Sequence, residues 1–416
     1  MLAGSYALVG WGDNFAVGGH GRLSEATSTA SPVPSTVVTD ITNTAQLDPG
    51  VMVVSVPLGV NFSVPGSLYG TKAKAPLHLG PENAKGMTKD GFGPQAALPL
   101  PDGQRILYHF WKELTPFPSY APGDPEVAGG THMSTPSIRL IDTTSGEDSV
   151  VVDGARSMAW RADGMFAYAK GVDPDYRLNV PYLQRLFVQE GLNGSPQVWT
   201  SDADVYQVLQ WVKDSLFVWR EPFAGDPELL AFTGPDQVRR VLTEGQFLLA
   251  VSPDGERVLA TSGGGDPTQS PFVIHLVDWE TGIEKDRLSF DGLIDSASGS
   301  PLSGMHCAAW AGERIVVGVH PAHVAILSVK DDALSLERVL TFRYPRIRPG
   351  SVDELLLDES GSTLYVVASE GSSPDSLERT SVLTYDIDSG QCTRWIVPGP
   401  PAISRLVSNP SRPSGR

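Results

Sequence analysis

Three of the eight histidines lie close together in the sequence and are the residues best suited to hold a metal ion. His320 and His323 are three residues apart in His320-Pro-Ala-His323, and His306 precedes them. Imidazole nitrogen is a common metal ligand, and a tight loop can present two imidazoles to one ion. The apolar residues on both sides of the pair predict strands, which places the pair in a connection. We interpret His306, His320 and His323 as a candidate divalent-metal site; the alternative is exposed loop histidines beside one strand histidine.

Two long segments rich in aromatic residues are the candidate binding loops. The binding residues that we predict in them are Tyr108, Trp111, Phe117 and Tyr120 in the first, and Tyr176, Arg177 and Tyr182 in the second. Both segments follow a predicted strand and are longer than a minimal hairpin needs. Long loops on a rigid scaffold often carry binding residues, and ordinary loop decoration is the alternative.

The overall composition excludes several classes of protein. The 416 residues include 48 acidic and 31 basic ones, and a net charge of −17 argues against a general nucleic-acid binder, which needs Lys and Arg to displace counterions. Two cysteines, Cys307 and Cys392, are too few for a disulfide framework, and we expect buried free thiols. No run of apolar residues approaches the ~18–20 that span a bilayer, so we predict no transmembrane segment in this chain.

The elements that must position these residues are short strands in a repeat. A hydrophobic run ends in a tight turn, most clearly Pro253-Asp254-Gly255, and a second hydrophobic run follows at once. Related turns contain Asp102, Asp163, Asp214, Gly312 and Gly361, at intervals of 40 to 61 residues. Glycine takes the positive φ of such turns without steric cost, and Asp tolerates it. A second hairpin with an Asp-x-x-Thr/Ser-Gly turn completes each unit, which predicts four strands per unit.

Four-stranded units at this spacing are typical of β-propeller blades, which bury both faces of each sheet by stacking around an axis. We predict an all-β protein, a β-propeller of four-stranded antiparallel blades. Six units are visible in the sequence. Strand-like residues 50–64 and 402–410 would complete one more blade, so we favour seven blades, closed by the N- and C-terminal strands, with six as the alternative. Trp160, Trp211 and Trp310 precede equivalent turns and are expected to pack between blades.

This pattern divides the chain into a flexible segment and a single folded domain. Residues 1–39 are predicted to be a flexible N-terminal segment, whose residues 24–39 form a tether rich in Ser, Thr and Pro, and residues 40–412 a single propeller domain. The N-terminus lacks the positive residues that open a signal peptide. The tether suits a protein held off a membrane by an upstream anchor, and it favours an extracytoplasmic location over a cytoplasmic one.

The turn Ser252-Pro253-Asp254-Gly255 and the hairpin Asp278-Trp-Glu-Thr-Gly282 resemble the repeats of TolB-like and other WD-type propellers. The paired Gly-His and Trp-Asp signatures of eukaryotic WD repeats are missing, and unit lengths vary more. The resemblance implies the fold; relatives with this repeat style include exported bacterial scaffolds and the propeller domains of some peptidases. It implies no activity, because the matching residues are turn residues.

The function that we favour is therefore binding without catalysis: an acidic scaffold, expected to be monomeric, that presents one ring face and its aromatic loops to a protein or small-molecule ligand. The alternative is a hydrolase or lyase that acts from the central channel with a divalent metal. The sequence contains no Gly-x-Ser-x-Gly nucleophile motif, and we predict no cofactor beyond the metal of that alternative.

Overall fold

The computed structural model describes residues 36–57, 66–73, 75–80, 97–113, 134–172, 183–222, 227–243, 245–262, 272–290, 303–320, 323–343, 347–371, 378–399 and 402–408. Every regular element in these residues is a β-strand, so the all-β prediction is confirmed. None of the described residues belongs to a helix that could cross a bilayer.

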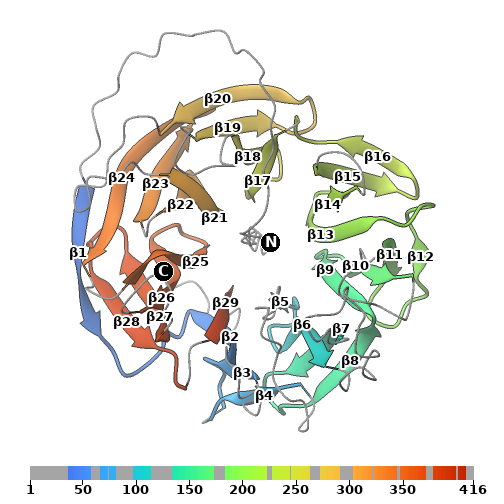
Figure 1. Cartoon of the computed structure of the whole chain (residues 1–416), viewed down its shortest axis with the longest axis horizontal. Coiled ribbons are helices and arrows are strands. Elements are labelled where there is room, and N and C mark those ends of the chain that lie inside the picture. The colour runs from blue at the N-terminus through green and yellow to red at the C-terminus, as the bar shows by residue number, and fades with distance from the viewer. Residues whose placement is uncertain are drawn as a thin grey trace, which may run out of the picture.

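Four sheets each consist of four consecutive strands (Figure 1). The first contains β5 (Ala97–Pro99), β6 (Arg105–Glu113), β7 (Ser134–Asp142) and β8 (Asp148–Asp153). The second contains β9 (Ala155–Trp160), β10 (Met165–Gly171), β11 (Gln184–Glu190) and β12 (Gln197–Val198). The third contains β13 (Val205–Val212), β14 (Ser215–Glu221), β15 (Glu228–Gly234) and β16 (Gln237–Arg240). The fourth contains β17 (Gln246–Val251), β18 (Arg257–Ser262), β19 (Val273–Asp278) and β20 (Ile283–Ser289).

A nine-stranded sheet contains two further units of this kind, joined by one strand. The first unit is β21 (Ser303–Ala311), β22 (Arg314–His320), β23 (His323–Lys330) and β24 (Ala333–Arg343). The second is β25 (Ile347–Leu357), β26 (Thr363–Glu370), β27 (Arg379–Asp386) and β28 (Cys392–Ile396). The joining strand, β1 (Thr36–Asn43), runs parallel to the outer strands β24 and β28 of both units.

The remaining sheet closes the ring with strands from both ends of the chain. Its order is β29 (Ala402–Ser408), β2 (Val51–Pro57), β3 (Gly66–Tyr69) and β4 (Leu77–Leu79). β2 and β29 pair antiparallel over seven positions, from Val51 with Ser408 to Pro57 with Ala402. The predicted closure by N- and C-terminal strands is confirmed by this pairing.

The hydrophobic core runs around the ring, in the layers between neighbouring units. Each of seven buried clusters combines side chains from two adjacent units, and the last joins the closing sheet to the unit of β25–β28. A twisted sheet that is apolar on both faces is stable only when both faces are covered, and this arrangement covers them. Trp160, Trp211 and Trp310 all contact such clusters, as expected.

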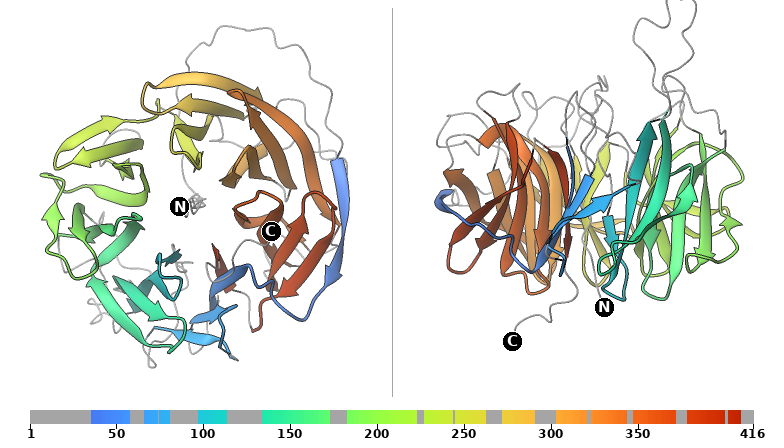
Figure 2. Two further views of the ribbon diagram at one scale, coloured as in Figure 1. Left: turned by 180° about the vertical axis from the view of Figure 1, so that it is seen from behind. Right: turned by 90° about the horizontal axis from the view of Figure 1, so that it is seen from below.

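Figure 2 shows the resulting disc from behind and from below. The propeller prediction is confirmed, and the described strands form five four-stranded sheets and one nine-stranded sheet.

The N-terminal boundary of the fold differs from the prediction. β1 begins at Thr36, so residues 36–39 belong to a strand rather than to the expected tether. The run Thr36-Val-Val-Thr39 is rich in β-branched residues, and two outer edge strands offer unpaired backbone groups that it satisfies. Thr39 is buried there. Residues 1–35 lie outside the described residues. Cys307 and Cys392 are buried and free, as expected.

The Asp-x-x-Thr-Gly hairpin provides a direct test of turn chemistry. Gly282 has φ of 71°, its amide donates to the Asp278 carbonyl at 2.8 Å, and a Cβ added at this position would meet no atom. The cost of Gly282→Ala is therefore backbone strain alone. We expect about 1 kcal/mol of lost stability, measured by urea unfolding, and a smaller loss for Gly282→Asn because Asn tolerates this conformation. Equal stability of the Ala variant and the native protein would contradict this account of the turn.

Candidate functional site

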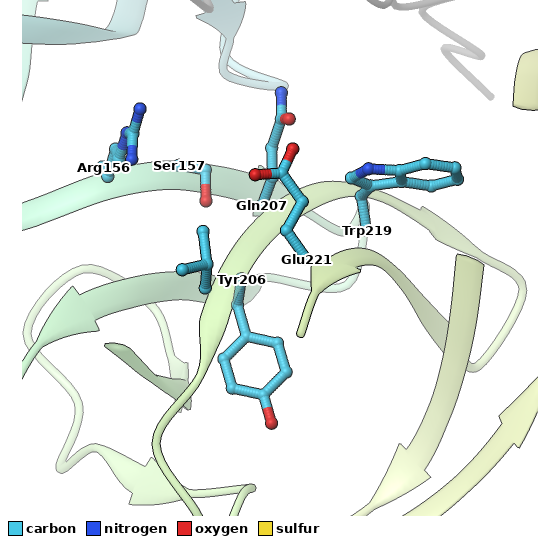
Figure 3. A pocket seen from close by; sticks show the side chains of 7 residues that line it. Arg156, Ser157, Tyr206, Gln207, Trp219 and Glu221 are labelled. Carbon is cyan, nitrogen blue, oxygen red and sulfur yellow. The ribbon is translucent and has the colours of Figure 1, made fainter. Parts of the chain in front are cut away.

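A small hollow lies beside the innermost strands of two neighbouring units, which we call the hub hollow. Its volume of about 360 Å³ includes the open solvent at its mouth, so the space that the side chains enclose is much smaller. The side chains that line it and are labelled in Figure 3 are Arg156, Ser157, Tyr206, Gln207, Trp219 and Glu221. They come from the starts of β9 and β13 and from the end of β14, so the hollow opens on one ring face.

Strand register brings most of these side chains together. In the antiparallel pair β13–β14, Val205 lies opposite Glu221 and Gln207 opposite Trp219. Opposite residues, and residues two apart on one strand, point to the same face of a sheet. Gln207, Trp219 and Glu221 therefore share a face, and Figure 3 shows the side chains of Gln207 and Glu221 extending in the same direction.

Side chains from the neighbouring unit fix the backbone beneath the hollow. The Val208 amide donates to Ser157 Oγ at 2.8 Å, and the Tyr206 amide donates to Gln184 Oε1 at 3.0 Å. Ser157, Gln184 and Tyr206 are all buried. Two inter-unit hydrogen bonds thus hold β13 against its neighbour, and they form a rigid base for the exposed groups above it.

The hollow contains groups of both charges. Burial raises the pKa of the Glu221 carboxyl, and the positive charge of Arg156 opposes this rise. Arg156 also affects His109 in the adjacent unit: burial and, to a smaller extent, the Arg156 charge together lower the pKa of His109 to about 3. His109 is therefore neutral at physiological pH, and Arg156 is the basic residue among the described residues that line the hollow.

The hub hollow contains several kinds of polar and aromatic group. It offers a guanidinium, a carboxylate, a primary amide and an indole, which suit a ligand with charged and apolar groups. Among the described residues that line it, none is a histidine or a cysteine, and Ser157 Oγ accepts a backbone hydrogen bond. Sequence reasoning missed Arg156 and Glu221. The only signal was that charged residues occupy the ends of two strands that the repeat places on one face.

The structure changes the interpretation of the first aromatic segment. Tyr108 lies within β6 and is 1 % exposed, so it is a core residue and not a loop residue that contacts a partner. Its hydroxyl donates to Asp148 Oδ2 at 2.5 Å and accepts from the Gly80 amide at 2.7 Å. Trp111 is also part of β6. Phe117, Tyr120, Tyr176, Arg177 and Tyr182 lie outside the described residues, and their role stays a prediction.

The strands that flank both aromatic segments end on the face of the hub hollow. β6 and β10 are the second strands of their units, like β14, whose last residue lines the hollow. Because strands alternate in direction, the second strand of each unit ends on this face. The connections from β6 to β7 and from β10 to β11 therefore start on the same side of the ring as Arg156 and Glu221.

The three histidines of the candidate metal site lie in strands. His306 is in β21, His320 ends β22 and His323 begins β23. His323 is 4 % exposed, and its Nδ1 is 2.9 Å from Thr341 Oγ1. The expectation that His323 is an exposed loop residue is thus wrong, because the strands extend further than the apolar runs indicated. In the part of the chain that the structure describes, no three His, Cys, Asp or Glu side chains form a group able to hold a metal ion.

Comparison with known proteins adds a likeness in fold. No family model matches the sequence, and no curated protein matches it. A prolyl endopeptidase structure is 14% identical with a TM-score of 0.50, over 86% of this chain and 50% of that chain. TolB from Acinetobacter baumannii is 13% identical with a TM-score of 0.43, over 87% and 68% of the two chains. Prolyl oligopeptidase B from Galerina marginata is 14% identical with a TM-score of 0.47, over 88% and 51%.

The chain spans about half the length of these two peptidases. At such identities the likeness concerns the fold alone. The chain is a β-propeller that resembles TolB-like propellers and the propellers of prolyl peptidases in fold.

Proposed function

We propose that this propeller is a binding protein that recognises an extended peptide segment of a partner on the ring face around the hub hollow. The observation that carries the proposal is that Arg156, Glu221 and Trp219 line one hollow whose base is held by two hydrogen bonds between units. An extended segment presents charged and apolar side chains at fixed spacing, which matches such a surface. The two long connections that begin on the same face would enlarge the contact area.

The charges of the hollow indicate what the segment contains. A carboxylate of the partner would pair with the Arg156 guanidinium in bidentate geometry, and a basic or amide group would pair with Glu221. Trp219, which is half-buried, lies beside Glu221 (Figure 3) and offers an apolar contact next to these charged groups. Arginine and tryptophan are the residues most often found to dominate interface energies.

A phage-displayed random peptide library tests the proposal. The wild-type chain is expected to enrich peptides that carry both charge signs, and the double variant Arg156→Ala/Glu221→Ala to bind these peptides at least about tenfold more weakly, since one lost interfacial contact of 1.4 kcal/mol gives that factor. The matched control is Glu256→Ala/Glu280→Ala, which removes two exposed charges from turns of the opposite ring face.

The melting temperature of the Arg156→Ala/Glu221→Ala variant is expected to stay unchanged. If the library yields no enriched peptide, or if the enriched peptides bind the hub variant as well as the control variant, the proposed binding face is wrong. An extracytoplasmic location is a further part of the proposal; it rests on the Ser/Thr/Pro-rich composition of residues 24–35.

A further inference from the structure

A serine, a histidine and a glutamate form a hydrogen-bonded chain across three neighbouring strands of one unit, which we call the serine relay. Ser262 Oγ lies 2.6 Å from His275 Nε2, and His275 Nδ1 lies 2.8 Å from Glu284 Oε2. Ser262 ends β18, His275 lies in β19 and Glu284 in β20, and Figure 1 shows these strands side by side in one unit. Nothing in the hub hollow depends on these residues.

The hydrogen bonds determine the tautomer of the imidazole. An ionised carboxylate only accepts hydrogen bonds, so His275 Nδ1 donates to Glu284. In the neutral ring Nε2 then carries no proton and accepts from the Ser262 hydroxyl. This is the arrangement that prepares a serine for attack: a base within reach of the hydroxyl proton, and a carboxylate that orients the base.

Burial and position fit this chemistry. The His275 side chain is 10% exposed and that of Glu284 42%, while Ser262 is half-buried at the last position of β18. Ser262 therefore lies at the end of a strand, at one face of the ring, and the imidazole of His275 beside it is largely buried. Arg287 is the register partner of His275 and is exposed, so its guanidinium lies on the same face of the sheet.

We propose that Ser262 is a nucleophile towards carboxylic acid esters, with His275 as general base and Glu284 as the positioning residue. Ser262 Oγ bonds to the acyl carbon while its proton passes to His275 Nε2. The imidazolium then gives this proton to the leaving oxygen as the ester C–O bond breaks. Water repeats the sequence on the acyl-serine, which releases the carboxylic acid and restores the Ser262 hydroxyl. Arg287 supplies positive charge for the oxygen that becomes negative in each step.

Fluorophosphonate labelling with mass-spectrometric mapping tests this assignment, because the Oγ–P bond forms as fluoride leaves, by the same attack. The full-length wild-type chain is expected to carry the adduct on Ser262, and the Ser262→Ala variant to carry none. The rate at which each variant hydrolyses p-nitrophenyl acetate should follow its rate of labelling. His275→Gln is expected to slow labelling by about 100-fold or more. Ser328→Ala is the matched control, since Ser328 is hydrogen-bonded to Ser335 Oγ and not to a histidine; its labelling should equal that of the wild type.

The positioning role has its own readout. Glu284→Gln should slow labelling, and Glu284→Asp should restore part of the rate, with equal melting temperatures in both variants. The assignment is overturned if the wild type carries no adduct under conditions that saturate chymotrypsin, or if labelling persists in Ser262→Ala or is unchanged in His275→Gln. Ser262→Ala should bind the library peptides of the hub face like the wild type, so failure of either proposal is visible without the other.

Discussion

Replacement of Arg394 by Met is expected to cost about 3–5 kcal/mol of unfolding free energy, because it leaves a buried carboxylate without its cation. Arg394 Nη2 lies 2.5 Å from Glu370 Oε2, and the two side chains are 1% and 2% exposed. Ser381 Oγ donates to Glu370 Oε1 at 2.5 Å, and Arg394 Nε donates to Ser381 Oγ at 3.1 Å. The pair is therefore enclosed, and its charges are not screened by water.

The same arginine connects two parts of the fold. Arg394 Nη1 donates to Asn43 Oδ1 at 3.1 Å, and the Thr44 amide donates to the Arg394 carbonyl at 2.8 Å. Asn43 is the last residue of β1, so Arg394 holds the strand that spans two outer edges. Arg394→Met is thus also expected to weaken the attachment of β1 to the rest of the fold. In this variant the backbone amides of β1 should lose hydrogen-exchange protection before those of β27.

Two controls separate the buried charge from the loss of packing. The double variant Glu370→Gln/Arg394→Met removes both charges and is expected to be more stable than Arg394→Met alone, since no ion is left buried. Arg105→Met removes one member of an exposed pair with Asp102, whose side chains are 44% and 35% exposed, and should cost no more than about 1 kcal/mol. Urea unfolding measures all three. A loss for Arg394→Met as small as that for Arg105→Met would show that the pair is not enclosed as described.

The fold was predictable from the sequence because its signals are local. An Asp-Gly turn and the hydrophobic runs beside it identify a hairpin without knowledge of the rest of the chain. The same local reasoning misplaced Tyr108, since its partners Gly80 and Asp148 are 28 and 40 residues away. Nothing near Tyr108 in the sequence indicates that β6 continues and turns this hydroxyl inward.

The candidate sites could not be predicted from the sequence, because they depend on strand register and on the packing of units, which the sequence does not show directly. Arg156 and Glu221 come from different units and line one hollow only when these neighbouring units pack together. The serine relay lies within 23 residues, but the β19–β20 ladder shifts register between Leu276 and Val277. A bulge changes which residues of two strands share a face, and its position cannot be derived from alternation alone.

The last large effect concerns the pH dependence of stability, and it originates at the seam where the ring closes. Glu354 in β25 is 8% exposed, and its Oε2 accepts the amide hydrogen of Leu406 in β29 at 2.5 Å. Burial raises the pKa of this carboxyl to about 7, while the Arg405 charge and the Leu406 amide oppose the rise and Asp353 adds to it. The ordinary value is 4.5, so the folded chain holds this proton where the unfolded chain has released it.

The sign of the effect follows from proton linkage. Below about pH 4.5 the carboxyl is protonated in both states and contributes no difference. Between about pH 4.5 and 7 the folded state binds more protons, so stability falls as the pH rises, and above about pH 7 the full cost of ionising a buried group is present. A shift of this size corresponds to about 3 kcal/mol, at 1.36 kcal/mol for each pH unit.

Glu354→Gln removes the titration while keeping an oxygen that accepts the Leu406 amide. We expect the variant to be similar to the wild type at pH 5 and more stable by about 3 kcal/mol at pH 8, as measured by urea unfolding at one-unit intervals. Glu256→Gln, at a side chain that is 66% exposed, is the matched control, and its difference from the wild type should stay constant with pH. If the difference between Glu354→Gln and the wild type is also constant, the carboxyl is ionised in the folded ring at neutral pH, and the seam between β25 and β29 contains a charge that Arg405 balances.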